Sequence, residues 1–124
     1  MTITAKVIGF NKNIEEEVFL ELNGIQLDVF AVFVPYKIYV GEEYPVKLYL
    51  FMDKLEPEKS MDSVKNFIKC DQGFGYKITG YLDTNGVFDA GVPFEAEDFQ
   101  EFSYLYGNYV SFYVDRIDAE FLER

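Results

Sequence analysis

An Asn-Gly pair at residues 23 and 24 separates two stretches in which apolar and polar side chains alternate. Asn-Gly is the preferred pair for a two-residue β-hairpin turn, because both turn positions need a positive φ. A turn at this pair places six aliphatic side chains on one face of the hairpin. They pair as Leu22 with Ile25, Leu20 with Leu27 and Val18 with Val29. The sequence therefore predicts an antiparallel hairpin that buries this one face.

Other stretches of the chain have the aromatic and β-branched composition that is typical of strands. They are residues 3–10, 44–52, 76–82, 87–92 and 108–122. The stretch 44–52 is apolar on both faces, which predicts a central strand that is covered on both sides. In 108–122 the parity of the apolar positions reverses near Asp115 and Arg116, which predicts a one-residue bulge within one long strand.

Two segments have helical periodicity. Ser60 is a suitable N-cap, and it precedes an apolar stripe at helical spacing, which predicts a helix packed on the core. The stripe consists of Met61, Val64, Phe67 and Ile68. The second segment, 96–107, has Ala96, Phe99, Phe102 and Leu105 at spacings of three. This second pattern is compatible with a short helix and with an irregular acidic loop, and the sequence does not choose between them.

These elements predict a mainly β protein with one inserted short helix. A chain of 124 residues is long enough for one domain with a core of its own, so we expect a single domain, 1–124. A small twisted barrel or rolled antiparallel sheet is the natural architecture, because closing a sheet removes its exposed edges. The element order is similar to that of the OB-fold, which is an analogy of order alone.

The segment 80–91 carries Asp83, Asn85 and Asp89 around a glycine, and these oxygens raise the question of calcium. An EF-hand loop needs oxygens at positions 1, 3 and 5, glycine at 6 and glutamate at 12, and this spacing is not met. A four-residue hairpin loop, 83–86, fits better and pairs Leu82 with Val87. In that loop Asp83 accepts backbone N–H groups and Gly86 supplies a positive φ.

Residue types that are absent exclude several kinds of chemistry. The chain has no histidine and a single cysteine, Cys70, which removes the common zinc and iron ligand sets and the Ser-His and Cys-His pairs. Gly73 and Gly75 lead into a strand, whereas a phosphate cradle precedes a helix. We therefore expect no enzyme activity and no catalytic, metal-binding or cofactor-binding residues. The lone cysteine and the absence of a signal peptide or membrane span favour a soluble cytoplasmic protein.

Net charge sets the class of partner. The formal charge is −11, which disfavours nucleic acid and anionic membranes and speeds association with a basic protein. In 94–109 carboxylates alternate with aromatic residues, a combination that suits an interface with a basic partner. The candidate partner-binding residues are Glu95, Glu97, Asp98, Glu101, Tyr104 and Tyr106. The simpler interpretation, which we prefer, is that the aromatic residues are core and the acids are their solvated face.

The function that these observations favour is a non-catalytic, acidic protein-binding module that docks on a basic partner. In size and charge the chain is like the small bacterial inhibitors of the immunity type, although it has no diagnostic motif. One alternative is an OB-like module that binds an oligosaccharide or peptide through exposed aromatic residues. Another is a self-associating structural subunit, and hence a homo-oligomer.

Overall fold

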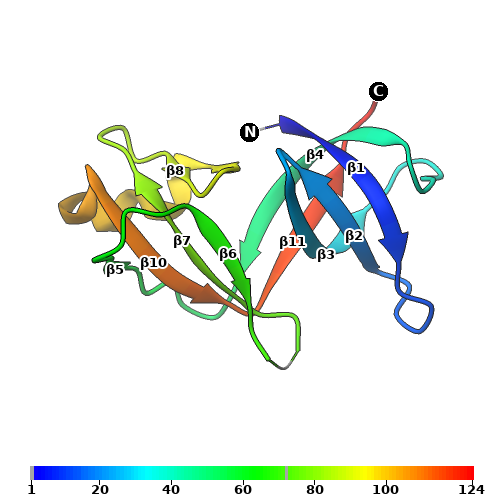
Figure 1. Ribbon diagram of the computed structural model, residues 1–124. Helices are drawn as coiled ribbons and strands as arrows, with labels where there is room; N and C mark the ends of the chain where they lie inside the picture. The colour runs from blue at the N-terminus through cyan, green and yellow to red at the C-terminus, as the bar shows by residue number, and fades with distance from the viewer. Residues whose placement is uncertain (1, 72) are drawn as a thin grey trace. The chain divides into compact units, whose positions relative to one another are not determined.

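The computed structural model describes residues 2–71 and 73–124, and this part of the chain is mainly β, as expected (Figure 1). In the described residues there is one helix, the 3-10 helix η1 (Ala96–Leu105), which is kinked at Phe102. The strands are β1 (Thr2–Phe10), β2 (Glu17–Leu22), β3 (Ile25–Phe33), β4 (Glu43–Phe51), β5 (Glu58–Lys59), β6 (Asn66–Lys69), β7 (Tyr76–Leu82), β8 (Phe88–Asp89), β9 (Pro93–Phe94), β10 (Asn108–Val114) and β11 (Arg116–Phe121).

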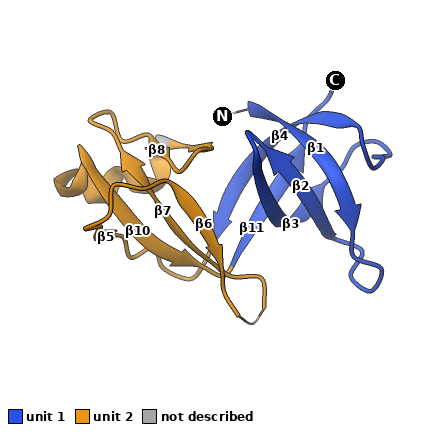
Figure 2. Cartoon of the chain, in the orientation of Figure 1, with its two compact units in different colours: residues 1–51, 116–124 blue, residues 52–115 orange. Residues whose placement is uncertain are grey.

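The chain divides into two compact units, which Figure 2 shows in different colours. The barrel unit contains residues 1–51 and 116–124, and the sheet unit contains residues 52–115. The sheet unit is therefore an insertion between β4 and β11 of the barrel unit. That the whole chain behaves as a single domain stays a prediction.

The barrel unit is a closed ring of five strands in the order β1-β2-β3-β11-β4. β11 runs parallel to β3, and the other pairs that the ring contains are antiparallel. This ring confirms the expected small barrel. Its interior holds aliphatic and aromatic side chains that are almost fully shielded from solvent, because one face of every strand points inward. They include Val7, Leu20, Leu27, Val29, Val46, Ile117 and Phe121.

The hairpin of β2 and β3 has the predicted register. Asn23 and Gly24 hold φ values of +51° and +80°, as a two-residue turn requires. The pairs Leu22 with Ile25, Leu20 with Leu27 and Val18 with Val29 are all confirmed.

β4 does not have the two covered faces that its sequence predicts. Its inward side chain Val46 is fully buried, but Tyr49 and Phe51 on the outer face are 37% and 46% exposed. The physical reason is that a closed barrel has one interior, so a second apolar face has no core to enter. Cations cover part of it instead: the Arg116 guanidinium lies 4.2 Å from the ring centroid of Phe51, and the Lys47 ammonium lies 5.5 Å from that of Tyr49.

The sheet unit is built on the strand order β5-β10-β7-β8-β9, with β6 also paired to β7. Its core is a cluster of aromatic rings. The Phe88 centroid lies 5.1 Å from that of Phe112 and 5.2 Å from that of Phe99, and all three side chains are nearly or fully buried. Aromatic contacts at these separations stabilise beyond the area that they bury.

The helix predicted to follow Ser60 is wrong. The Ser60 hydroxyl accepts the N–H of Asp62 (3.1 Å), as an N-cap would, but no helix follows and residues 66–69 form β6 against β7. Of the predicted stripe, Met61 is 95% exposed, while the Phe67 ring lies 6.2 Å from that of Phe94. Pairing with β7 overrides the local helical periodicity, because the next strand supplies hydrogen-bonded partners while the Phe67 ring packs against Phe94.

The single strand predicted over 108–122 is also wrong. β10 ends at Val114 in the sheet unit, and β11 begins at Arg116 in the barrel unit. The apolar residues on both sides of Asp115 are buried, but in two different cores. The reversal of parity therefore marks the passage of the chain from one unit to the other, and a bulge within one strand is not its cause.

The segment 80–91 forms a hairpin, as expected, but the pairing of its two strands differs by one residue from the predicted register. Leu82 pairs with Phe88, where the sequence favoured Val87, because this register sends the Phe88 ring into the aromatic core. The predicted roles inside the loop are confirmed. The Asp83 carboxylate accepts the N–H groups of Asn85 (2.8 Å) and Val87 (2.9 Å), and Gly86 holds a φ of +84°.

The backbones of β7 and β8 approach each other closely at Gly80, which explains why a glycine stands at this position. A Cβ atom at Gly80 would lie 2.4 Å from the carbonyl oxygen of Asp89, which is inside van der Waals contact. Any side chain at position 80 would therefore push the β8 backbone away from β7.

Candidate functional site

Buried side chains fix the helix that carries the predicted partner-binding residues. Phe99 is fully buried and Leu105 is 7% exposed, so η1 is attached to the core of the sheet unit. The Tyr106 hydroxyl donates a hydrogen bond to the carbonyl oxygen of Phe99 (3.3 Å). Its ring also lies against the turn at Gly86, where a Cβ atom would come within 2.6 Å of the Tyr106 hydroxyl. Tyr106 therefore packs against its own chain and is half-buried.

The remaining predicted residues lie mostly at the surface. Glu97, Asp98 and Glu101 are exposed, and Tyr104 is 73% exposed, whereas Glu95 is half-buried just before the helix. We call Glu97, Asp98, Glu101 and Tyr104 the η1 surface. Glu97 and Asp98 are in the first turn of η1, where negative charge favours the helix.

The segment 94–109 is interpreted from its sequence either as an interface with a basic partner or as core aromatic residues with a solvated acidic face, and each interpretation describes a part of it. Phe99 and Leu105 are core residues, as the simpler interpretation holds, but Tyr104 is a surface aromatic residue among carboxylates. The side chain of Ala96, the first residue of the apolar pattern, lies outside the described part of the structure. The binding role of the six residues stays a prediction.

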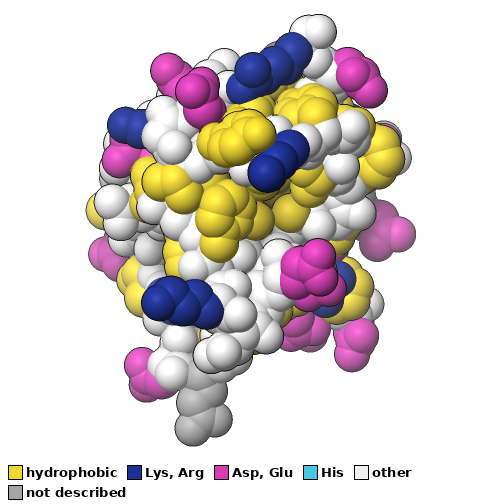
Figure 3. Space-filling model, turned by 90° about the vertical axis from the view of Figure 1, so that its right-hand side faces the viewer, with side chains coloured by type: hydrophobic (Ala, Val, Ile, Leu, Met, Phe, Trp, Pro, Cys, Tyr) yellow, Lys and Arg dark blue, Asp and Glu magenta, His cyan; other side chains and the backbone are white. Residues whose placement is uncertain are grey.

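A second surface was not found by sequence reasoning. At one end of the barrel unit six large apolar side chains are between 37% and 56% exposed, and we call them the barrel-end surface. They are Phe10, Val32, Phe33, Val34, Tyr39 and Val40. On the side of the barrel unit that Figure 3 shows, hydrophobic side chains gather with lysine and arginine side chains among them. The available signal was the unbroken apolar run 29–34, in which the alternation of β3 is lost.

Two neighbouring hollows are lined by residues of the segment 34–44 at this end of the barrel. The first has a volume of about 430 Å³ and the second of about 440 Å³, and Tyr36 and Lys37 line both. The first is also lined by Phe10, Glu15, Glu16 and Val34, and the second by Tyr39, Glu42, Tyr44, Glu123 and Arg124. Because the two neighbouring hollows share the lining residues Tyr36 and Lys37, we call them together the barrel-end groove.

Internal contacts hold the tyrosine rings of the groove in place. The rings of Tyr36 and Tyr44 are stacked with centroids 5.7 Å apart, and the Tyr36 hydroxyl donates to the carbonyl oxygen of Leu122. The Tyr44 hydroxyl accepts the backbone N–H of Tyr39 (2.7 Å). Partial burial raises the pKa of the Tyr36 phenol, so it stays a neutral donor at physiological pH.

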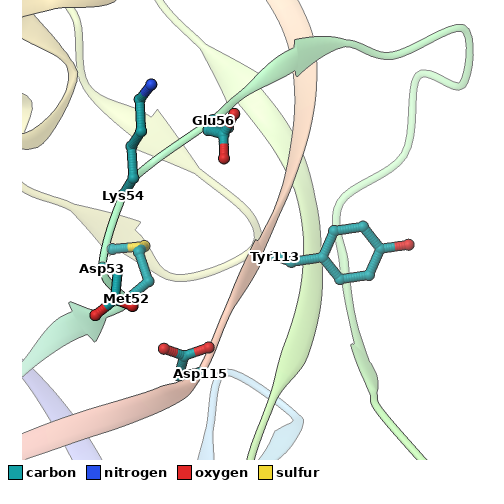
Figure 4. A pocket seen from close by; sticks show the side chains of 6 residues that line it. All are labelled: Met52, Asp53, Lys54, Glu56, Tyr113 and Asp115. Carbon is teal, nitrogen blue, oxygen red and sulfur yellow. The ribbon is translucent and has the colours of Figure 1, made fainter.

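A third hollow lies in the sheet unit and has a volume of about 290 Å³. It is lined by Met52, Asp53, Lys54, Glu56, Tyr113 and Asp115. Figure 4 shows that its charged side chains point in different directions, and that Tyr113 points away from Asp115. Among the residues that the structure describes, no three carboxylate or thiol side chains gather as a group that could hold a metal ion.

The carboxylates of Asp83 and Asp89 in segment 80–91 are engaged by the chain itself. The Lys65 ammonium lies 2.9 Å from the Asp89 carboxylate, which also accepts the N–H of Gly91 (2.8 Å). The Lys65 hydrogen bond, followed by that of Gly91, lowers the pKa of Asp89. Within 2–71 and 73–124, no helix has the length and apolar character that crossing a membrane requires.

Comparison with known proteins places the chain in a family. The family model described as uncharacterised conserved protein UCP019853 matches residues 1–122, and the chain belongs to this family. No curated protein and no solved structure matches the chain significantly.

Proposed function

We propose that this member of the UCP019853 family is a non-catalytic binding protein that docks on a basic protein partner through its η1 surface. The observation that carries the proposal is the exposure of Tyr104. Its aromatic side chain is 73% exposed, although it belongs to the same helix as Phe99, which is fully buried. Aromatic side chains supply much of the binding energy of protein interfaces.

A surface of this kind loses little conformational freedom when it binds. Burial of Phe99 and Leu105 already fixes the η1 backbone, so a partner has only the exposed side chains left to order. The ordering cost on this side of the interface is therefore limited to a few rotamers.

The negative charge of the chain determines which class of partner it favours. The net charge of −11 and the exposed carboxylates of Glu97 and Glu101 favour a basic surface and speed its approach. Small size and strong negative charge support the analogy with immunity-type inhibitors. The single cysteine supports a reducing location, the cytoplasm.

We further propose that the barrel unit is OB-like. The support is the ring order β1-β2-β3-β11-β4 with a parallel β3–β11 pair, which is a five-stranded closed barrel. In this proposal the barrel is the scaffold and the sheet unit, inserted between β4 and β11, carries the docking helix.

The test starts with capture of a partner by the full chain from native cell extract, followed by binding kinetics at low and high salt. Association should slow steeply as salt rises, because steering between opposite charges is screened. Reversal of Glu97, Asp98 and Glu101 to lysine should slow association and leave the fold intact, since exposed acids contribute little to stability. Salt-independent association, or an acidic partner, would contradict the proposal.

The rate of dissociation tests whether Tyr104 holds the partner in place. Tyr104→Ala should speed dissociation, and Tyr113→Ala is the matched control, because Tyr113 is 64% exposed on β10 of the same unit. Tyr106→Ala should instead lower stability, because its ring packs against Gly86. Equal effects of Tyr104→Ala and Tyr113→Ala on dissociation would place the interface elsewhere.

A further inference from the structure

The barrel-end groove presents aromatic rings that the chain leaves partly uncovered. Tyr39 is 54% exposed and Phe10 is 42% exposed, and the stacked pair Tyr36 and Tyr44 lines the same groove. Exposed aromatic rings are efficient platforms for a flat ligand with an apolar face, since an aromatic side chain has few rotatable bonds to order on binding. The C–H face of a sugar ring is such a surface.

The same groove offers both hydrogen-bond donors and acceptors. Lys37 and Arg124 supply N–H donors, and their charged groups lie over tyrosine rings, 5.4 Å from the Tyr39 centroid and 4.2 Å from the Tyr44 centroid. The acceptors are the carboxylates of Glu15, Glu16, Glu42 and Glu123. A sugar hydroxyl donates one hydrogen bond and accepts two, so a ligand with many hydroxyls matches such a mixed lining.

Charge and size restrict the ligand further. Four carboxylates face two cations in the groove of a chain whose net charge is −11, so an anionic ligand is repelled and a neutral one is not. Each hollow, at about 430 and 440 Å³, is in the range of small-ligand sites. Because Tyr36 and Lys37 line both hollows, a linear ligand of several rings that passes these two residues would occupy both.

We propose that the barrel-end groove binds a neutral oligosaccharide, with Tyr39 and Phe10 as stacking platforms. Lys37, Arg124 and the groove carboxylates hold its hydroxyl groups. This site lies on the barrel unit and does not depend on the docking of a protein at the η1 surface.

The test is a nuclear magnetic resonance titration of the ¹⁵N-labelled full chain with four neutral tetrasaccharides: cellotetraose, tetra-N-acetylchitotetraose, maltotetraose and xylotetraose. Tetragalacturonic acid serves as the anionic comparison. At least one neutral probe should shift amide signals of 10–16 and 34–44 in a saturable way below about 10 mM. Tyr39→Ala should weaken that binding about tenfold or more, and Phe10→Ala should weaken it independently. Tyr113→Ala, an exposed tyrosine of the other unit, should leave the affinity unchanged.

Several outcomes would overturn the proposal. They are no saturable shift with any of the four neutral probes, shifts that map to other residues, and binding of the anionic probe alone. Should the same amides shift with protein concentration and without sugar, this surface is an interface between copies of the chain. If Tyr39→Ala is unfolded in its one-dimensional spectrum, the Phe10→Ala affinity decides.

Discussion

Gly24 holds a φ of +80° as the second residue of the turn between β2 and β3, and no other atom lies near the position of a Cβ. A substitution there tests backbone conformation alone. Gly24→Val should lower the free energy of unfolding by about 1–3 kcal/mol, because a β-branched residue is strained at positive φ. Gly24→Asn is the control and should lose less, since asparagine tolerates this conformation. Urea melts measure both, and a neutral valine variant would contradict the two-residue turn.

Asp89 links stability to pH. Its pKa is lowered in the folded chain by the Lys65 hydrogen bond, so its stabilising contribution is present above the ordinary aspartate pKa of about 3.9. That contribution is lost as pH falls through the lower pKa of the folded state. Both side chains are about 40% exposed (40% for Lys65 and 43% for Asp89), so solvent screening limits the pair to less than about 1 kcal/mol.

The measurement is the difference in unfolding free energy between the natural chain and Asp89→Asn, which keeps an oxygen for the N–H of Gly91. The difference should be present near neutral pH and should shrink as pH falls below about 4. A difference that grows on acidification would show that the Lys65 pair is not its source.

At the scale of elements, β6 replaces the helix that the sequence predicts, and two alanine substitutions distinguish these structures. Phe67 is half-buried, with its ring 6.3 Å from that of Tyr76 and 6.2 Å from that of Phe94. Phe67→Ala should cost about 2–4 kcal/mol of unfolding free energy, somewhat below the cost at a fully buried site. Met61→Ala should change it by less than about 0.5 kcal/mol, because Met61 is 95% exposed. A helix would bury both residues on one stripe, so similar losses in urea melts would favour the helix.

At the scale of the whole molecule, the sheet unit enters and leaves the barrel between residues that face each other. Phe51 at the end of β4 is the direct pairing partner of Arg116 at the start of β11. Replacing residues 52–115 by Asn-Gly therefore converts β4 and β11 into a hairpin with a favourable turn. We expect the remaining barrel unit, about 60 residues, to fold with modest stability, because a chain of that size buries about 60% of its unfolded surface.

Dispersion of amide signals and a cooperative thermal transition measure this outcome, with the full chain as the control. A shortened chain without a cooperative transition would show that the ring of β1, β2, β3, β11 and β4 needs the sheet unit in order to fold.

Much of the structure that depends on near neighbours in sequence was determined by the sequence itself. The turn at Asn23 and Gly24 and the role of Asp83 in its loop follow from local hydrogen bonds and allowed φ values. Strand composition and alternation were sufficient to predict a mainly β barrel. The candidate acids and Tyr104 could likewise be listed from the sequence, although their placement at the surface could not.

The remainder was decided by contacts between residues that are distant in sequence. The Phe67 ring packs against that of Phe94, which favours 66–69 as a strand beside β7, and two separate cores explain the parity change at Asp115. Ring closure leaves one face of β4 outside, and it leaves the end of β3, with Val32 and Phe33, at the surface. Periodicity reports which side chains share a face, whereas the partner that covers that face is chosen by the free energy of the whole fold.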